Sequence, residues 1–536
     1  MSRLIGTKPN QMPTNADLGT MAYQNTDSAS IKSATIRELY NTPDYTGKRG
    51  PNKNPSLLLD FANGHLPGYF PVARRCEQAY LDKSGIMRWS ARNEINCDHD
   101  PETLEPLGMR VELTQTNQFA TSSFGCSSSG NSPEFRASFI QGSTSAQNTT
   151  ETLSPDGKTQ ALKLQSTNGS TNSRIYSNSN PIYNGINTFS FFAKKIDSLS
   201  ASKFIAIDCD NVNIQVIYNL QDGEIHYVDG AGVGTSVLLN WGMEPYPNGW
   251  YRCHATLNNA VGVGGTSSND WRVYLCTNTA NPSGPFTGNE GAYLWGAQLE
   301  ASEYPTSLIR TFGQSKTRGS TLGGSMELHD YHDNDSKKFP NPAMGLTYLV
   351  EGTEQWIRDS GTNHYVFTLR SAQGGSEYLG LRMGGSSGRM AHQIYTGTGY
   401  NTHEIGQYPD LNTDFQVRSY TTVGSIGPKL GFQASCKFHK STQFSGGPGS
   451  GDYSQNNSVY GNANYNSNQG SLLYTSSTPD YATVIPTNLP GRNTTLDELC
   501  LGSSQGGQPM ENGWIKRIIL YPGEVDKETL IEMAEK

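Results

Sequence analysis

The side chains best suited to bind a ligand lie in a long polar loop near the C-terminal end of the chain. Tyr453, Tyr460, Tyr465 and Tyr474 are set there among Asn, Gly and Ser residues. Tyrosine offers a large contact area at a low cost in rotamer entropy, and Asn supplies donors and acceptors that hydroxyl groups match. The loop is long for a connection between strands. It predicts a recognition surface, with a loop that binds nothing as the open alternative.

A second candidate is Trp250-Tyr251-Arg252, which follows the turn signal Pro247-Asn248-Gly249. The CH groups of sugars pack on aromatic faces, and strand alternation puts Trp250 and Arg252 on one face. Such a pair at the start of a strand favours a structural role. Glycan binding by Trp250 and Arg252 is the competing hypothesis.

The acidic and glycine-rich segments do not match catalytic or metal motifs. His329 to Asp335 lacks the Gly and the distal Glu of a calcium loop and is typical of a solvated linker. The carboxylates between Glu94 and Glu102 invite glycoside hydrolysis, but spacing alone does not place them about a substrate. Gly262 to Thr266 is not followed by a helix pattern. We therefore expect no catalytic residues, no metal, no cofactor and no enzyme activity.

Composition indicates the elements that would position these groups. Of the 536 residues, 34% are hydrophobic and 16% charged, and Gly, Ser, Thr and Asn fill the difference. Small polar residues favour turns over helices, and the 28 tyrosines favour strands. The net charge of −8 argues against nucleic-acid binding. The eight cysteines show no CxxC pair and no zinc spacing. Their even number permits disulfides, but a chain this long does not need them, so we expect free, mostly buried thiols.

Short apolar or alternating runs predict strands at 109–113, 188–193, 204–207, 214–218 and 271–275, and Gln221-Asp222-Gly223 is a hairpin turn signal. This pattern predicts an all-β chain with two jelly-roll or concanavalin-like sandwiches behind a short attachment segment. No secretory leader and no apolar run long enough to span a membrane is visible. The Gly/Ser/Thr-rich stretch from Gly313 to Ser325 predicts a break between two strand series. The expected divisions are an attachment segment at 1–50, a β-rich leader at 51–130 packing on the first sandwich, a first sandwich at 131–320 and a second at 326–536.

Several landmarks follow one another in a recognisable order. They include Tyr293-Leu294-Trp295-Gly296-Ala297-Gln298-Leu299-Glu300, then Tyr304-Pro305-Thr306-Ser307 and Arg310-Thr311. This set resembles a signature of phage tail-fibre and minor structural proteins that carry concanavalin-like or carbohydrate-binding-module-like sandwiches. By alternation Trp295 should lie on the opposite face of its strand from Gln298 and Glu300. Where the family usually has Gly after this run, the chain has Ser302 or Glu303. The sequence therefore does not decide whether the turn at this point has the family's conformation.

The two ends of the chain extend the resemblance. Asn15 to Tyr23 is similar to N-terminal repeats of phage fibres, especially those of marine and cyanobacterial phages, and Glu511 to Arg517 resembles the last strand of a laminin-G-like sandwich. The resemblance covers about two-thirds of the chain and is more specific for origin than for function, because one fold hosts many functions.

These observations together predict a virion structural protein, a tail fibre or adsorption appendage exposed on the particle. Its expected partners are other virion proteins, bound through residues 1–50, and host surface polysaccharide. The resemblance implies a homo-oligomer, usually a trimer, in which several weak sugar sites would act together. A head, collar or capsid decoration protein of the same phage is the first alternative, and a polysaccharide depolymerase is the second.

Overall fold

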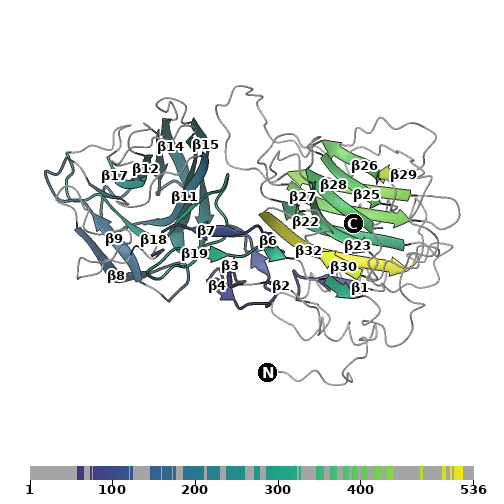
Figure 1. The fold of residues 1–536 in the computed structure, drawn as a ribbon. Coiled ribbons are helices and arrows are strands. Elements are labelled where there is room, and N and C mark those ends of the chain that lie inside the picture. The colour runs from purple at the N-terminus through teal and green to yellow at the C-terminus, as the bar shows by residue number, and fades with distance from the viewer. Residues whose placement is uncertain are drawn as a thin grey trace, which may run out of the picture.

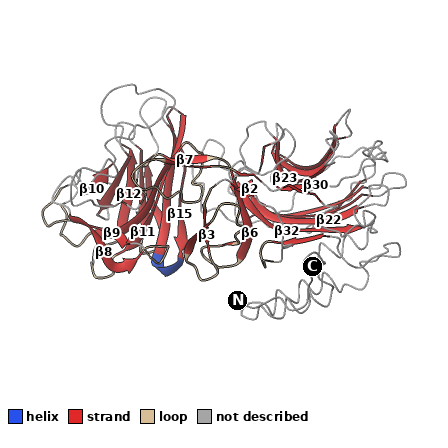
Figure 2. Cartoon of the chain, turned by 60° about the horizontal axis from the view of Figure 1, so that its bottom comes forward, coloured by secondary structure: helices blue, strands red, loops and turns tan. Residues whose placement is uncertain are grey.

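We analysed a computed structural model of the chain. It describes residues 57–64, 73–74, 76–119, 121–122, 124, 145–158, 160–171, 173–176, 185–209, 214–229, 237–259, 271–277, 285–322, 325–327, 346–354, 363–370, 378–384, 389–395, 400–407, 415–423, 430–438, 471–474, 498–501, 508–509 and 512–522. The regular secondary structure of this part is almost entirely β-strand, which confirms the predicted fold class (Figures 1 and 2). Within it, no helix has the length and apolar character that a membrane crossing requires.

The first sandwich consists of a six-stranded and a five-stranded antiparallel sheet. The six-stranded sheet has the order β15 (Val237–Tyr246), β16 (Trp250–Asn259), β11 (Gly185–Lys195), β18 (Gly291–Glu300), β9 (Gln160–Gln165) and β8 (Ser145–Leu153). The five-stranded sheet has the order β10 (Arg174–Tyr176), β17 (Trp271–Cys276), β12 (Phe204–Cys209), β13 (Ile214–Asn219) and β14 (Glu224–Asp229). The sequence patterns therefore predicted strands in the right places.

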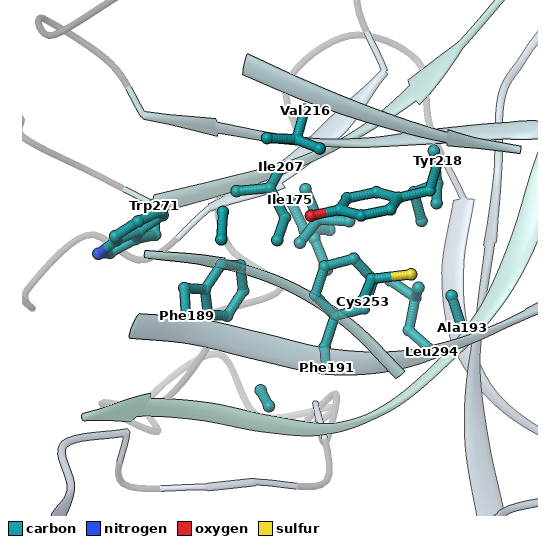
Figure 3. Close-up of a cluster of buried hydrophobic side chains, with 14 of the residues drawn as sticks. Ile175, Phe189, Phe191, Ala193, Ile207, Val216, Tyr218, Cys253, Trp271 and Leu294 are labelled. Carbon is teal, nitrogen blue, oxygen red and sulfur yellow. The ribbon is translucent and has the colours of Figure 1, made fainter. Parts of the chain in front are cut away.

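The core of this sandwich lies between the two sheets (Figure 3). Phe189 and Phe191 of β11 face Trp271 and Tyr218 from the opposite sheet, in keeping with the period of two along each strand. Phe192 points to the outer face of its sheet and is equally buried. The run Phe189 to Ala193 is therefore almost continuously apolar because both faces of β11 are covered.

Turn residues join these strands as their types require. Pro247, Asn248 and Gly249 form a short 3-10 turn between β15 and β16, in which Asn248 has φ 62° and Gly249 has φ 74°. Asn and Gly tolerate this left-handed backbone better than other residues. The predicted hairpin turn at Gly223 likewise links β13 and β14, with φ 72°.

The second sandwich consists of a larger pair of sheets. One has the order β29 (Ser471–Tyr474), β28 (Leu430–Phe438), β27 (Phe415–Val423), β22 (Leu346–Glu354), β32 (Asn512–Pro522), β6 (Pro106–Glu112) and β5 (Asp98–His99), with β1 (Leu57–Asp60) also paired to β32. The other has the order β21 (Ser325–Glu327), β30 (Glu498–Leu501), β23 (Asn363–Arg370), β24 (Tyr378–Gly384), β25 (Arg389–Tyr395) and β26 (Tyr400–Gln407), with β31 (Gln508–Pro509) paired to β23.

The leader therefore supplies strands to the second sandwich. Strand β32 pairs with β22 along one side, while β6 and β1 pair with successive parts of its other side. The leader also meets the first sandwich, because its hairpin of β3 (Gln78–Leu81) and β4 (Met87–Ser90) contributes Ala79 and Met87 to an apolar cluster with Trp250 and Trp295. In Figure 1 strands β3, β4 and β6 lie between the two sandwiches.

The stretch from Gly313 to Ser325, which the sequence suggested as a break, is paired with other strands. Strand β19 (Lys316–Arg318) pairs with β7 (Gln115–Asn117), and β20 (Thr321–Leu322) pairs with β2 (Ala73–Arg74). The small residues from Gly313 to Ser325 are compatible with short paired strands as well as with a linker. The connection between the sandwiches is therefore fastened to the leader.

Candidate functional site

Trp250 begins β16 on the outer face of the six-stranded sheet and is almost wholly buried. Its indole Nε1 donates a hydrogen bond to the carbonyl of Leu153 at 3.1 Å. Its ring packs with Phe192, Trp295 and Met87. At 1% exposure, neither face of the ring is open to a sugar.

Arg252 lies two residues further along the same face and is 3% exposed. Its Nη2 donates to the carbonyl of Thr306 at 2.6 Å and to Ser190 Oγ at 3.2 Å, and its guanidinium lies 5.6 Å from the centre of the Phe192 ring. Trp250 and Arg252 therefore make the structural contacts that the sequence favoured. Neither side chain offers exposed surface to which a glycan could bind.

The tyrosine loop is largely outside the described residues. This holds for Tyr453, Tyr460 and Tyr465, as it does for the segments 329–335 and 262–266. Tyr474 ends β29, whose backbone pairs in parallel with β28 opposite Gln433. Recognition by this loop stays a prediction.

The predicted placement of Trp295 opposite Gln298 and Glu300 is wrong, and a β-bulge is the reason. Trp295 pairs with Phe192 and Gln298 pairs with Ser190, so the register between β18 and β11 shifts by one residue. Gly296 takes φ 68° at the bulge. A Cβ there would lie 2.6 Å from Phe192 Cδ2, which explains the need for glycine. The bulge turns Trp295, Gln298 and Glu300 to the same outer face.

Gln298 and Glu300 hold the segment that follows their strand. Glu300 accepts hydrogen bonds from the Thr306 backbone N–H at 2.8 Å and from the Thr306 hydroxyl at 2.7 Å. Gln298 accepts from the Ile309 backbone N–H at 2.7 Å and donates to Glu300 at 2.8 Å. Gln298 and Glu300 therefore fasten residues 306–309 onto the end of β18, and the two segments form one structural unit.

A buried ion network joins this unit to the leader. Glu112 at the end of β6 is fully buried and lies 3.0 Å from both Arg110 and Arg318. It also accepts from the Ser307 backbone N–H at 2.6 Å, from the Ser307 hydroxyl and from Gln78 Nε2 at 2.6 Å. Burial raises the pKa of Glu112, but the two arginines and Ser307 outweigh it and lower the pKa to about 2.

The same network reaches the second sandwich through Asp98. The Asp98 carboxylate accepts from Trp514 Nε1 of β32 at 2.9 Å and lies 3.3 Å from Arg110. The Arg110 guanidinium lies 4.9 Å from the centre of the Trp514 ring and donates to Asn512 Oδ1 at 3.4 Å. Burial opposes the charge of Arg110, yet Glu112 and Asp98 raise its pKa above the ordinary value. One buried network thus fastens the leader to both sandwiches.

Acidic side chains between Glu94 and Glu102 make hydrogen bonds and ion pairs within the fold. Asp98 is committed to the network above, and Asp100 Oδ1 accepts the backbone N–H groups of Glu102 and Thr103 in a turn. No group of three His, Cys, Asp or Glu side chains able to hold a metal ion is found among the described residues. In the same part of the chain six cysteines are not in disulfides, and four of them are buried.

Sequence reasoning missed the partners of the network. The alternation around Met109 and Val111 predicted a strand, but nothing in it indicated that Glu112 would meet Ser307 and Arg318 some 200 positions away. The available signal was Arg110 and Glu112, two charged residues two positions apart within an otherwise apolar strand pattern.

No protein-family model and no curated protein matches this chain. Among solved structures, the chain is similar to a Trypanosoma rangeli sialidase in complex with sialic acid, with 10% identity, 70% of this chain and 60% of that chain covered, and a TM-score of 0.23. A second structure of the T. rangeli sialidase, with a difluoro sugar analogue, gives 10% identity, 69% and 60% coverage, and a TM-score of 0.21. Domains LG4-5 of the mouse laminin alpha1 chain give 9% identity, 67% and 92% coverage, and a TM-score of 0.16.

The match spans about 60% of the length of the sialidase chains. Likeness at these TM-scores assigns no activity. It does correct one expectation, namely that this chain is not an enzyme, because the structures found include sialidases. We therefore no longer exclude enzyme activity.

Proposed function

We propose that this chain is a structural protein of a bacteriophage particle, a tail fibre or related adsorption appendage that presents lectin-like sandwiches to host surface glycans. The observation that supports this most is the way in which the leader is built into both sandwiches. Strands β1 and β6 extend the sheet of the second sandwich, and Glu112 binds Ser307 behind the first. A stiff multidomain body of this kind suits an appendage that must hold binding surfaces at a fixed distance from a particle.

The sequence landmarks add to this proposal. The residues that resemble phage fibres, from Tyr293 to Thr311, are those that form the bulged strand and the segment bound to the leader. The resemblance thus concerns the architecture of the body, and a ligand does not follow from it. Glycan recognition is assigned to surface groups, with the loop from Tyr453 to Tyr474 as one candidate.

The proposed assembly is a homo-oligomer, a trimer by resemblance, attached to other virion proteins through residues 1–50. Several weak sites on one appendage raise the effective concentration of the next binding event, so avidity replaces single-site affinity. The protein would assemble in the host cytoplasm and be exposed on the finished particle.

Deleting Met1 to Arg49 tests the attachment. We expect a folded, soluble protein with the circular dichroism of the full chain that is absent from purified particles, whereas a full-length control is incorporated. Normal incorporation of the deletion protein would place the attachment elsewhere. A cryo-electron map of the particle with the full chain locates it, and density on the head or collar would replace the fibre proposal with a decoration role.

Recognition by the loop is tested by replacing Tyr460 and Tyr465 together with Ser. We expect slower adsorption of otherwise identical phage to host cells, with normal amounts of the protein on the particle. Unchanged adsorption would remove this loop as the recognition surface. Release of shortened capsule fragments by the purified chain would indicate a depolymerase.

A further inference from the structure

Phe312 is an unusually exposed aromatic side chain at a defined place in the fold. It is 74% exposed, the highest value among the large hydrophobic side chains that the structure describes. Its backbone is held by an isolated bridge to Thr121, so the ring stands on a fixed support. It directly follows the landmark segment that is fastened to the leader.

Phe312 ends a series of stacked groups that begins in the buried apolar cluster. Trp295 meets Trp89 edge to face at 6.3 Å between ring centres. The guanidinium of Arg310 lies 3.8 Å from the centre of the Trp89 ring and 5.9 Å from that of Phe312. Arg310 is therefore oriented by two aromatic rings, which lowers the entropy it would lose on binding a ligand.

A carboxylate and a second cation complete the surface. Glu77 accepts hydrogen bonds from Arg310 Nη2 at 2.9 Å and from Lys316 Nζ. The three side chains are 28%, 31% and 39% exposed for Glu77, Arg310 and Lys316. Burial raises the pKa of Glu77, but its bonds to Lys316 and Arg310 lower it below the ordinary value, so the acid stays ionised. Two cations and one anion leave one net positive charge beside an exposed ring.

We propose that Phe312, Arg310, Lys316 and Glu77 form a binding site for an acidic sugar residue, a pyranose that carries a carboxylate. The CH face of the pyranose would pack on Phe312, and its carboxylate would bind the planar fork of Arg310 and the ammonium of Lys316. Glu77 would hold both cations in place and accept a sugar hydroxyl. This site rests on the proposed function, since it names the glycan class that the appendage recognises.

The ring and the charge together favour this ligand over others. A neutral sugar would use Phe312 but would gain little from the net positive charge. A purely anionic group such as inorganic phosphate would use the cations but would leave the exposed ring without a role. Because the cations are partly exposed and already paired with Glu77, each site should bind weakly and lose affinity in salt.

The test uses the full-length protein and isothermal titration calorimetry with oligogalacturonate, alginate and hyaluronan fragments, and with a neutral galactan fragment of matched length. We expect at least one acidic fragment to bind, more weakly in 0.5 M than in 0.05 M NaCl, and the neutral fragment to bind less. Phe312→Ala should weaken binding about tenfold, the scale of one well-placed aromatic contact. Leu153→Ala is the control, because Leu153 is 59% exposed and belongs to another part of the first sandwich.

Charge changes give a second, directional readout. Glu77→Gln keeps one acceptor oxygen for the cations or a sugar hydroxyl but raises the local net charge from one to two, so the gain in charge should tighten binding of the acidic fragment several-fold. Lys316→Gln lowers the local net charge to zero and should weaken binding. The Lys316→Gln affinity is compared with that of the wild type, so this result can be read even if Glu77→Gln lowers the melting temperature. A structural role alone would not give opposite signs to these two substitutions.

The proposal is overturned by binding of none of the acidic fragments, by equal affinity of Phe312→Ala and wild type, or by tighter binding of Lys316→Gln. It is also overturned if Phe312→Ala changes only the sedimentation coefficient of the oligomer, since Phe312 would then be a subunit contact. These results leave the virion role untouched, because incorporation into particles is measured separately with the Met1 to Arg49 deletion.

Discussion

Replacing Glu112 with Gln tests whether the buried network stabilises the joined sandwiches. Glutamine has the shape of the protonated acid, but it removes the charge that offsets Arg110 and Arg318, each 3.0 Å away. Its amide N–H₂ also replaces one of the two carboxylate oxygens, which together accept hydrogen bonds from Ser307 and Gln78. Breaking a buried ion pair by removing one partner costs about 3–5 kcal/mol, because the other charge is left uncompensated.

The lowered pKa of Glu112 expresses the same interactions as a dependence of stability on pH. Folding lowers it from the ordinary value of 4.5 to about 2. At 1.36 kcal/mol per pKa unit this difference corresponds to about 3 kcal/mol of stability at neutral pH. A lowered folded pKa means that the contribution is complete above about pH 4.5 and is lost as the pH falls toward 2. At pH 3 about 1 kcal/mol of it should remain.

Urea unfolding of the full chain, followed by tryptophan fluorescence at pH 7 and pH 3, measures both effects. We expect Glu112→Gln to lose about 3 kcal/mol at pH 7 and about 1 kcal/mol at pH 3. Glu102→Gln is the control, because Glu102 is exposed, and its effect should stay within about 0.5 kcal/mol. Equal effects of the two substitutions, or a loss at pH 3 as large as that at pH 7, would refute the assigned role of Glu112.

Three further substitutions or treatments check other parts of the structure. Gly296→Ala forces a Cβ to 2.6 Å from a ring carbon of Phe192 at φ 68°, so thermal and urea unfolding should show a loss of about 2–4 kcal/mol; a neutral effect would argue against the bulge. Trp514→Phe removes the 2.9 Å hydrogen bond to Asp98 and should cost about 1–3 kcal/mol in the same assay, whereas wild-type stability would mean that this bond contributes nothing. Trypsin should cut the native protein elsewhere before it cuts after Lys316 or Arg318, because β19 is paired and Arg318 is 2% exposed; early cleavage there, read by mass spectrometry, would restore the open linker.

The sequence was sufficient for the local elements of the fold. Period-two alternation and turn residues such as Asn248-Gly249 predicted strands and hairpins that the structure contains, because these signals depend on neighbours a few positions apart. The run from Thr188 to Ala193 likewise predicted the strand that the structure has as β11. Polar, tyrosine-rich composition was enough to predict an all-β chain, since such residues do not support helices.

Tertiary structure alone decided which face and which partner each side chain has. A single bulge at Gly296 moved Trp295 to the face of Gln298 and Glu300, because one extra residue in a strand of period two reverses every later orientation. For Trp250 and Arg252 the sequence favoured a structural role but left glycan binding open, and only the structure shows that the leader and the Thr306 segment cover both side chains. Phe312 gave no such signal in the sequence, yet long-range pairing left its ring exposed beside Arg310. Contacts between residues hundreds of positions apart are set by the packing of whole sheets, which local sequence patterns do not encode.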